Sequence, residues 1–374
     1  MKKQPIRIAQ IIGKWVGGGV EAVVMNYYRH IDRNKIQFDF ICDEDSTNIP
    51  YDEIESLGGK VIIIPPYQKV FKYHKELKRV LKEGNYKIVH SHINTLSVFS
   101  LCAAKAAGVP VRIAHSHSTT SKKEIRRNII KGILRHLSRL YPTVCCACSE
   151  KAAEFQFGKK YYQDGKVIII KNAIDINLFE YNKKSENEIR SSLGIDEKTL
   201  VIGHIGRFCT VKNHTFILDI YNEIHKENKN SILLLAGDGP LFNEVKKKIS
   251  LLKLDSNVKC LGYRNDVDNL YQAFNCFLLP SLYEGLPVVG IEAQASCNLC
   301  FFSTEITREI GILKSTQFIS LRTSAKEWAK IIVNKAKNFK KSSTYEAISD
   351  AGYNIRIESK KLQKLYFSLY TDIV

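Results

Sequence analysis

Short apolar runs alternate with longer amphipathic segments along almost the whole of this 374-residue chain. The runs are rich in Val, Ile and Leu, as expected for strands buried on both faces, and the segments between them have helical periodicity. Strands that alternate with helices in this way form parallel sheets, because each crossover needs a helix. The chain is therefore predicted to be an α/β protein with doubly wound parallel sheets.

The strand-like runs fall into two series, separated by a polar stretch at residues 182–190. The first series lies at residues 6–12, 38–42, 61–65, 88–92, 111–115, 144–148 and 167–170. The second lies at residues 200–206, 232–236, 258–261, 276–280, 300–303 and 318–321. An amphipathic segment at 355–370 has the pattern of a closing helix. We predict one domain over residues 1–171, a second over 172–352, and a closing helix in 353–374.

The chain is strongly basic, with 56 Lys and Arg against 38 acidic residues and a formal charge of +18. This balance favours anionic partners: phosphorylated substrates, acidic lipid or nucleic acid. No aromatic-rich RNA-binding signature accompanies the charge, so we expect no nucleic-acid partner. The ten cysteines are scattered rather than spaced as a framework, which predicts free thiols in a reducing compartment.

The sequence indicates a cytoplasmic protein. No signal peptide opens the chain, and the longest uncharged stretch, around residues 93–104, is too short to span a bilayer. The segment 122–141 interleaves cations with apolar residues, which predicts either an ordinary core-facing helix with a solvated outer face or one that docks on anionic lipid. A peripheral position on the inner face of the plasma membrane stays open.

The segment from Pro280 to Glu292 joins a strand end, a turn and a helix. Pro287 suits a first helical turn, so the helix is expected to begin near 283–286 and to offer backbone N–H groups to a diphosphate. On one ideal helix Glu284 and Glu292 would be separated by about 12 Å and about 80°. One carboxylate would then accept the hydroxyls of a hexose and the other those of a ribose. The backbone N–H groups that would bind the diphosphate are those of Tyr283, Gly285 and Leu286.

Two cations and several glycines lie at other strand ends. Arg207 follows the strand at 200–206 and Lys212 comes five residues later, which predicts a diphosphate clamp or, as the plainer alternative, two solvated surface cations. Gly237 opens a tight turn that could flank a nucleotide base. Gly18 and Gly19 let the backbone approach a phosphate or sugar, although a plain tight turn is an equal alternative.

Histidines occur in two pairs, His90 with His92 and His115 with His117, each at the end of a predicted strand. Neither pair has a Glu or Cys at metal-ligand spacing, so we expect no metal and favour hydrogen bonding to sugar hydroxyls or stabilisation of charge. Two D-x-D strings, at 43–45 and 266–268, could hold a divalent cation against a diphosphate. They are interpreted more simply as acids of a turn and of a helix start.

Together these motifs resemble the retaining glycosyltransferases of family 4, and most closely the branch that builds exopolysaccharides and capsules. The shared features are an E-x7-E pair at Glu284 and Glu292, G-R-F with Lys212, G-D-G-P at 237–240, G-G-V-E at 18–21, and N-A-I-D at 172–175. The resemblance covers nearly the whole chain. It implies a GT-B fold, with two Rossmann-like domains that face each other across a cleft and a C-terminal helix that returns to the first domain.

The resemblance also implies an activity: transfer of a hexose from a nucleotide diphosphate sugar, expected to be UDP-linked, to a polyprenyl-diphosphate-linked saccharide. The first domain would bind the acceptor and the second the donor. Members of this kind retain anomeric configuration and need no metal or other cofactor. A nucleotide-sugar epimerase of similar fold is the alternative enzyme, and a non-catalytic basic binding protein is the alternative of another class.

Residue roles follow from the same resemblance. Arg207 and Lys212 would bind the donor diphosphate, with help from the backbone amides of Gly285 and Leu286. Glu292 would hold the ribose, and Glu284 would contact the transferred sugar. A histidine at the end of the fifth strand corresponds to His117, with His115 as the other candidate.

The sequence departs from the family pattern after Glu292. The family has a glycine at the end of this helix, whereas this chain has Cys297. Another residue must then adopt the left-handed conformation, and Asn298 is the expected one.

Overall fold

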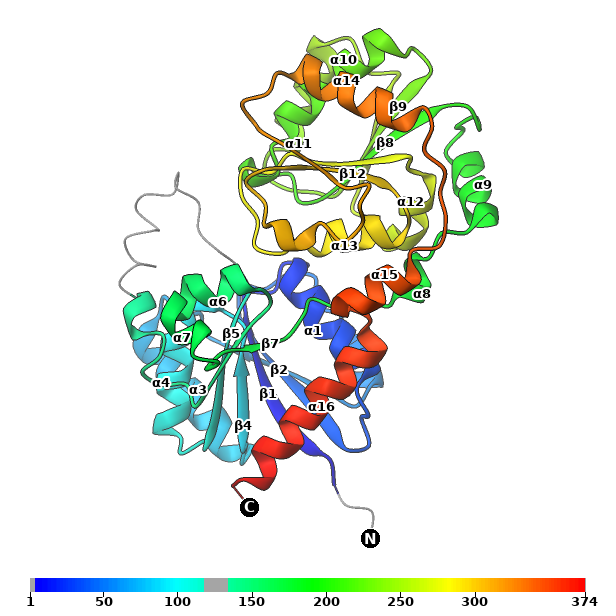
Figure 1. Ribbon diagram of the computed structural model, residues 1–374. Helices are drawn as coiled ribbons and strands as arrows, with labels where there is room; N and C mark the ends of the chain where they lie inside the picture. Colours follow the sequence, from blue (N-terminus) through cyan, green and yellow to red (C-terminus); the bar gives the residue numbers. More distant parts are fainter. Residues whose placement is uncertain (1–3, 118–133, 374) are drawn as a thin grey trace. The chain divides into compact units, whose positions relative to one another are not determined.

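The computed structural model describes residues 4–117 and 134–373. The chain divides into two compact units, Met1–Ala173 together with Ile355–Val374, and Ile174–Asn354 (Figure 1). Each unit is an α/β sandwich with helices on both faces of a parallel sheet, as predicted. The last helix belongs to the first unit, so the chain leaves that unit once and returns to it.

The sheet of the first unit has seven parallel strands within the described residues, in the order β3-β2-β1-β4-β5-β6-β7. The strands are β1 (Ile6–Gly13), β2 (Ile36–Asp43), β3 (Lys60–Ile64), β4 (Ile88–Ser91), β5 (Val111–Ser116), β6 (Val144–Ala147) and β7 (Ile168–Ile169). Strand order reverses between β1 and β4, which is where open α/β sheets bind ligands.

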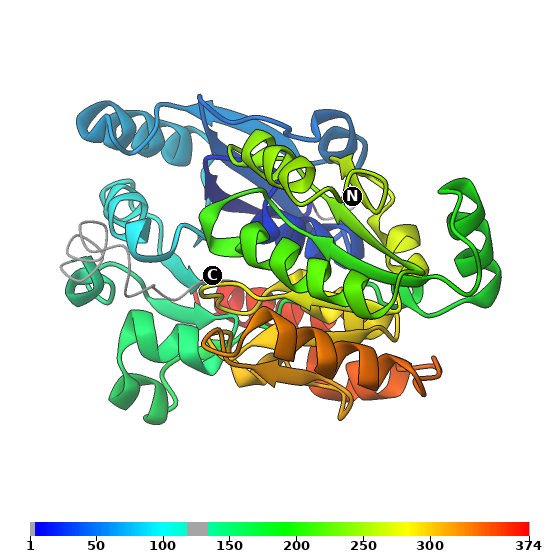
Figure 2. The ribbon, with the colours of Figure 1, turned by 90° about the horizontal axis from the view of Figure 1, so that it is seen from above.

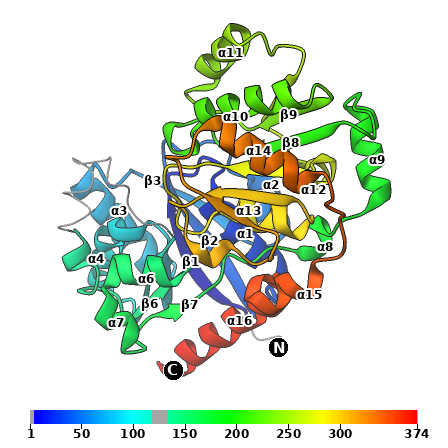
Figure 3. The ribbon, with the colours of Figure 1, turned by 45° about the horizontal axis from the view of Figure 1, so that its top comes forward.

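Helices cover both faces of this sheet. They are α1 (Gly19–His30), α2 (Tyr51–Ser56), α3 (Val70–Glu83), α4 (Ser97–Ala106), α6 (Glu150–Phe157), α7 (Lys159–Gln163) and α16 (Ile355–Thr371), with a 3-10 turn η1 (Asn94–Leu96). Helices α3 and α4 pack side by side on one face, and α1 packs against α16 on the other (Figures 1 and 3). The closing helix therefore completes the core of the first unit.

The second unit has a six-stranded parallel sheet in the part of the chain that the structure describes, in the order β10-β9-β8-β11-β12-β13. Its strands are β8 (Leu200–Ile205), β9 (Ser231–Ala236), β10 (Val258–Gly262), β11 (Cys276–Leu279), β12 (Leu299–Ser303) and β13 (Gln317–Ile319). Every residue of β9 and of β11 is buried, as their continuous apolar sequences predicted.

Helices flank this second sheet as well. They are α8 (Ile176–Phe179), α9 (Lys183–Ser192), α10 (His214–Glu227), α11 (Phe242–Leu251), α12 (Val267–Ala273), α13 (Val288–Ala295), α14 (Ala325–Ala336) and α15 (Tyr345–Ile348), with short turns η2 (Thr210–Lys212), η3 (Arg308–Ile310) and η4 (Ser349–Tyr353). Helices α10 and α14 lie side by side (Figures 2 and 3), and fully buried Trp328 of α14 belongs to the core they cover.

Each predicted strand is present, with ends that differ by at most a few residues. All ten cysteines are free. Within the described ranges, no helix is both long enough and apolar enough to cross a bilayer. The predicted amphipathic segment 122–141 lies largely outside the described residues. In its described part, the Arg135 and Arg139 guanidinium groups lie over the rings of Phe155 and Tyr161, at 5.5 and 5.1 Å from the ring centroids.

Candidate active site

In the second unit, the loop after β11 is fastened to the loop after β8. The Leu282 N–H donates to the Val211 carbonyl at 2.8 Å, and the Asn213 side chain donates to the Pro280 carbonyl at 3.1 Å. Asn213 has a φ of +57°, a left-handed conformation that asparagine tolerates better than most residues. Residues separated by about seventy positions in sequence thus share one edge of the sheet.

This fastening brings Lys212 and Glu284 together. The Lys212 ammonium donates to Glu284 Oε1 at 2.6 Å, and the Ser281 hydroxyl donates to the same oxygen at 3.1 Å. The two charged side chains are only 15% and 17% exposed. A lysine ammonium has three donors, so Lys212 can hold Glu284 and an anionic ligand at the same time.

Glycines make room for the Arg207 loop. A Cβ on Gly237 would lie 2.2 Å from the Gly206 carbonyl oxygen, and a Cβ on Gly206 would lie 3.2 Å from Cε of Lys212. The backbone of the turn at 237–240 therefore packs directly on the residue that precedes Arg207. Arg207 itself is exposed and has no ion-pair partner among the described residues, so its guanidinium is available to an anion.

The predicted helix start is wrong. Helix α13 begins at Val288, and Pro287 is its N-cap, with φ −69° and ψ 118°. A residue before proline avoids the helical region, which keeps Leu286 and the preceding loop out of the helix. Glu284 forms a parallel bridge with Ile306 instead, so the expected spacing of Glu284 and Glu292 along one helix does not apply. Tyr283, Gly285 and Leu286 lie in the loop before α13.

Glu292 lies on α13 in a half-buried environment. Its Oε2 atom accepts a hydrogen bond from the Tyr271 hydroxyl at 3.0 Å. Burial raises the pKa of Glu292 to about 7, and the nearby Asp268 carboxylate adds to this effect while the hydrogen bond from Tyr271 opposes it. Glu292 is therefore a carboxyl group that changes charge near neutral pH.

The left-handed residue after α13 is Cys297, with a φ of +52°, and not Asn298 as expected. Asn298 is fully buried and donates from Nδ2 to the Tyr271 carbonyl at 3.1 Å. The backbone thus keeps the conformation that the family's glycine allows, at a cost of about 1–2 kcal/mol for a side chain in this region. Cys297 also accepts a hydrogen bond at Sγ from the Ser342 N–H at 3.2 Å.

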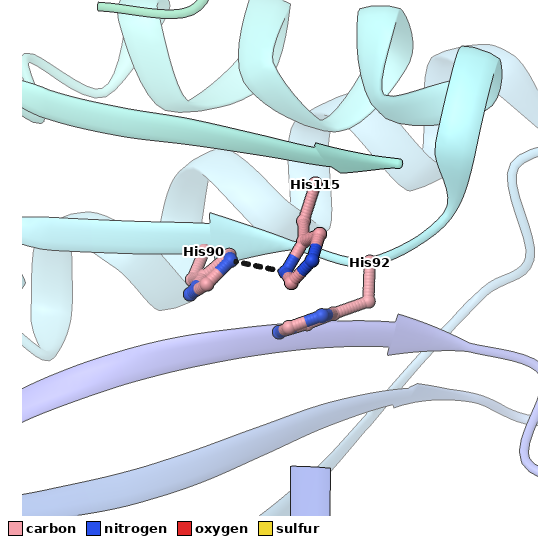
Figure 4. A group of neighbouring side chains, drawn as sticks. All are labelled: His90, His92 and His115. Atoms are coloured by element: carbon pink, nitrogen blue, oxygen red, sulfur yellow. Dashed lines mark hydrogen bonds between the residues drawn. The ribbon is translucent and has the colours of Figure 1, made fainter. Parts of the chain in front are cut away.

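In the first unit, the two histidine pairs come together at the ends of β4 and β5. His90 Nε2 lies 3.1 Å from His115 Nδ1, and His92 Nδ1 lies 2.9 Å from His117 Nε2 (Figure 4 shows the first contact). Burial lowers the pKa of all four histidines, that of His117 to about 3. The rings are therefore neutral at physiological pH.

The histidine rings are arranged for hydrogen bonding to one another. His90, His92 and His115 offer nitrogen atoms within 4.8 Å of each other, as a metal site requires. However, the His90 and His92 rings stack, with centroids 4.2 Å apart and planes at 26° (Figure 4). Nitrogen lone pairs lie in the ring planes, so stacked rings direct them side by side and not toward a common ion.

A cavity of about 380 Å³ opens beside these histidines at the carboxyl ends of β1, β2 and β4. Its lining combines apolar residues, among them Ile12, Val20 and Leu96, with polar ones. The polar ones include Glu21, Asp43, Asp45 and Asn94, and the ring of Tyr67 also lines it. The one cation in the described lining, Lys14, donates to Asp45 at 2.7 Å. Burial is the main cause that raises the pKa of Asp43 to about 7, and the neighbouring Asp45 carboxylate contributes to this shift.

The glycines at 17–19 form the turn between β1 and α1, with Gly18 as the N-cap of α1 and Gly19 as its first residue. The Glu21 carboxylate accepts a hydrogen bond from the Val16 N–H at 2.9 Å and closes this turn. Of the two D-x-D strings, Asp266 is the N-cap of α12, as its simpler interpretation predicted. Asp43 and Asp45 face the cavity, which the sequence analysis did not anticipate.

Sequence reasoning missed several residues of these sites: Ser281, Asn213, Tyr271, Gln10 and Tyr366. Ser281 and Tyr271 contact the two glutamates, whereas Gln10 and Tyr366 contact the histidines. The only available signal was a polar residue inside an apolar strand, as with Gln10 in β1. Ser281 lies only three residues before Glu284, whereas Tyr271 is 21 residues from Glu292 and Tyr366 is 276 residues from His90.

Comparisons with known families agree on both units. Residues 17–178 match the family described as Glycosyltransferase Family 4, and residues 185–353 match the family described as Glycosyl transferases group 1. EpsF of Bacillus subtilis strain 168 is 33% identical over 374 aligned residues, which cover 98% of this chain and 97% of EpsF. The UDP-Gal:alpha-D-GlcNAc-diphosphoundecaprenol alpha-1,3-galactosyltransferase of Escherichia coli is 25% identical over 80% of this chain and 79% of its own.

Solved structures show the same fold. Alr3699/HepE of Anabaena, crystallised with UDP and glucose, has a TM-score of 0.79 at 16% identity, and the alignment covers 97% of this chain and 100% of HepE. At this level of identity the likeness concerns the fold, and it matches the predicted pair of Rossmann-like units.

Proposed function

Because this chain belongs to glycosyltransferase family 4 and has the GT-B fold, we propose that it transfers a hexose from a UDP-linked sugar to a saccharide carried on polyprenyl diphosphate. Glycosyltransferase activity follows from family membership. The donor nucleotide, the lipid-linked acceptor and a place in exopolysaccharide or capsule synthesis are the proposed part. The Escherichia coli relative, whose name gives a UDP-galactose donor and a diphosphoundecaprenol acceptor, supports the proposed donor nucleotide and lipid-linked acceptor.

The pairing of Lys212 with Glu284 carries the proposal. It joins a cation suited to the donor diphosphate with a carboxylate suited to sugar hydroxyls, at 2.6 Å and largely out of solvent. The exposed Arg207 begins the same loop and supplies a second cation. Opposite charges held together in this way suit a ligand that carries phosphates at one end and hydroxyls at the other.

We assign the donor contacts accordingly. Arg207 and Lys212 bind the diphosphate, and the loop of Tyr283, Gly285 and Leu286 lies beside it. Glu284 accepts hydroxyls of the hexose, Glu292 accepts those of the ribose, and Gly237 lets its turn pack closely under the nucleotide. As the bond from the anomeric carbon to the diphosphate breaks, negative charge grows on the leaving oxygens, and the two cations stabilise it without a metal ion.

Retention of configuration is also part of the proposal. An acceptor hydroxyl attacks the anomeric carbon from the side that the diphosphate leaves, and its proton passes to the departing diphosphate oxygen. His117, or His115 beside it, contacts the donor sugar. A neutral imidazole suits this role because it can donate to or accept from a sugar hydroxyl, and burial keeps the pKa of His117 near 3.

The cavity of the first unit is the proposed acceptor site. Its carboxylates and amide can bind sugar hydroxyls, and the ring of Tyr67 offers an apolar face. The acidic lining disfavours a phosphate group, so the cavity would take the neutral saccharide end of the acceptor. The lipid diphosphate would then lie outside it.

Asp43→Asn tests the acceptor site. At a pH well above the Asp43 pKa of about 7, where this carboxyl is ionised, we expect the KM for the saccharide acceptor to rise about tenfold, because a charged hydrogen bond to a hydroxyl is replaced by a neutral one. Steady-state kinetics at saturating donor would measure the change. Asp164→Asn, an exposed carboxylate outside the cavity in the first unit, is the control. Equal acceptor KM values in all three proteins would contradict the assignment.

Glu292 predicts a pH dependence of donor binding. Its folded-state pKa of about 7 lies above the ordinary glutamate value of 4.5, so the carboxylate forms as pH rises through 7. The ionised form is the stronger acceptor for ribose hydroxyls, by about 1 kcal/mol. Affinity for UDP-glucose, measured by calorimetry, should increase about three- to fourfold from pH 6 to pH 8. Glu292→Gln should bind with little dependence on pH, and an equal slope in both proteins would refute the role.

The overall activity is tested by UDP release. Purified protein should release UDP from a UDP-hexose only when a polyprenyl-diphosphate saccharide is present. Isomerised donor without acceptor would indicate the epimerase alternative instead.

We also propose that the protein works at an anionic inner membrane face, where a lipid acceptor resides. The formal charge of +18 supports this, and binding to phosphatidylglycerol vesicles but not to phosphatidylcholine vesicles tests it.

A further inference from the structure

A buried hydrogen-bond network joins the histidines of the first unit to its first strand and its last helix. It contains Gln10 of β1, His90 of β4, His92 after it, His115 of β5, His117 after it and Tyr366 of α16. Each of these side chains is at most 6% exposed. Water therefore has little access to break or bypass the network.

One branch runs from the Gln10 carbonyl oxygen. Gln10 Oε1 lies 2.8 Å from His92 Nε2, and His92 Nδ1 lies 2.9 Å from His117 Nε2. Since Gln10 Oε1 only accepts, His92 must carry its proton on Nε2. His92 Nδ1 is then an acceptor, and His117 must also carry its proton on Nε2.

The other branch runs from the Gln10 amide nitrogen. Gln10 Nε2 donates to the Tyr366 hydroxyl at 3.1 Å, which lies 2.7 Å from His90 Nδ1. The single hydroxyl proton of Tyr366 is then donated to His90, whose own proton is on Nε2. His90 Nε2 lies 3.1 Å from His115 Nδ1, so His115 accepts there and carries its proton on Nε2.

The two branches are coupled because each neutral ring has one donor and one acceptor. If the Gln10 amide turns over, its nitrogen donates to His92 and its oxygen accepts from Tyr366. Every bond in both branches then reverses, and all four rings carry their protons on Nδ1. Intermediate patterns leave two donors or two acceptors facing each other in a buried site, which is costly.

We propose that Gln10 and Tyr366 are positioning residues that hold His90, His92, His115 and His117 in one shared tautomer, with all four protons on Nε2. The free ends of the network are then complementary. His115 then carries a proton at Nε2, which has no partner among the described residues, and His117 has a lone pair at Nδ1, which is buried as well. The chain's closing helix thereby fixes the proton positions of these two histidines. Only the importance of this for catalysis depends on the proposed function.

Nuclear magnetic resonance of protein with ¹⁵N-labelled histidine rings tests the proposal directly. Long-range ¹H–¹⁵N correlation distinguishes protonated from unprotonated ring nitrogens, and single His→Gln variants assign the ten histidines. We expect all four rings to have their proton on Nε2 in the unmodified protein. Because no donor or acceptor is added, this result is independent of whether sugar transfer is ever observed.

Two variants test the coupling. Tyr366→Phe keeps the ring that packs edge-on against Phe38 but removes the hydroxyl, so His90 and His115 should shift toward a mixture of tautomers. Gln10→Met should release His92 and His117 in the same way. Tyr370→Phe, the same change one turn further along α16, should leave all four spectra as they were.

A ring proton on Nδ1 in any of the four histidines of the unmodified protein would overturn the proposal. So would unchanged tautomers in Tyr366→Phe, provided that this variant is folded by circular dichroism.

Discussion

Replacing Lys212 with methionine is expected to lower turnover roughly 100- to 1,000-fold, the loss typical when a preorganised electrostatic group is removed from developing negative charge. The methionine keeps most of the side-chain volume against Gly206 but leaves Glu284 without its ion-pair partner. Charge on the departing diphosphate then loses a cation, and the uncompensated Glu284 carboxylate repels it. Steady-state UDP release at saturating substrates measures the effect.

A second ion pair in the same unit provides a matched control. Lys248 and Asp219 are also 2.6 Å apart, but they join α11 to α10, and neither residue belongs to the loops after β8 and β11. Lys248→Met should leave turnover within about twofold, because a surface ion pair contributes about 0–1 kcal/mol. The turnover of Arg207→Ala should lie between those of Lys212→Met and Lys248→Met. We expect a loss of roughly ten- to hundredfold, because Arg207 is more exposed and solvent partly screens its charge. Turnover of Lys212→Met close to that of Lys248→Met would exclude Lys212 from the mechanism.

Gly237→Ala is expected to have the largest effect on folding, about 3 kcal/mol of unfolding free energy. Its φ of +133° is a region that side chains avoid, and the new Cβ would lie 2.2 Å from the Gly206 carbonyl oxygen. The backbone cannot easily move away, because the Gly237 N–H donates to the Gly262 carbonyl at 2.7 Å and the Gly206 N–H donates to the Ala236 carbonyl at 3.0 Å. Urea unfolding followed by circular dichroism gives the free energy.

Gly262→Ala separates the cost of a side chain at positive φ from the cost of the close contact with Gly206. Gly262 ends the neighbouring strand with a φ of +66°, but a Cβ there meets nothing within 4 Å. Its substitution should therefore lower the unfolding free energy by about 1 kcal/mol, the cost of a side chain at positive φ alone. Gly237→Ala should also lose part of the stabilisation that UDP-glucose gives, because displacement of Gly206 moves Arg207. Equal losses of unfolding free energy in Gly237→Ala and Gly262→Ala would mean that the close contact between Gly237 and Gly206 does not affect stability.

The strands and the division into two α/β units could be predicted because their signals are local. Every residue of β9 is apolar or small, and such a run has few stable alternatives to a buried strand. The motif residues could also be found because they directly follow strands, and parallel strands bring their carboxyl ends to one edge. This reasoning reached Lys212 and Glu284 before their contact was known.

Prediction failed where a backbone choice depended on neighbouring atoms. Pro287 was expected inside the first turn of α13, but it caps the helix, and the bridge from Glu284 to Ile306 draws the preceding loop toward β12. The left-handed residue after α13 was assigned to Asn298 from its propensity. Tertiary packing reversed the choice, because Asn298 is needed in the core to bind the Tyr271 carbonyl, and Cys297 takes the strained position.

The class of fold, the family and the cations and carboxylates that we assign to donor binding can be found from local patterns, because strand periodicity and motif spacing are properties of neighbouring residues. The cavity lined by Asp43 and Asp45, and the contacts of Gln10 and Tyr366 with the histidines, arise instead from long-range packing. These contacts join residues as many as 356 positions apart, as between Gln10 and Tyr366. No local pattern specifies such a pair, since it forms only when the last helix packs on the first sheet.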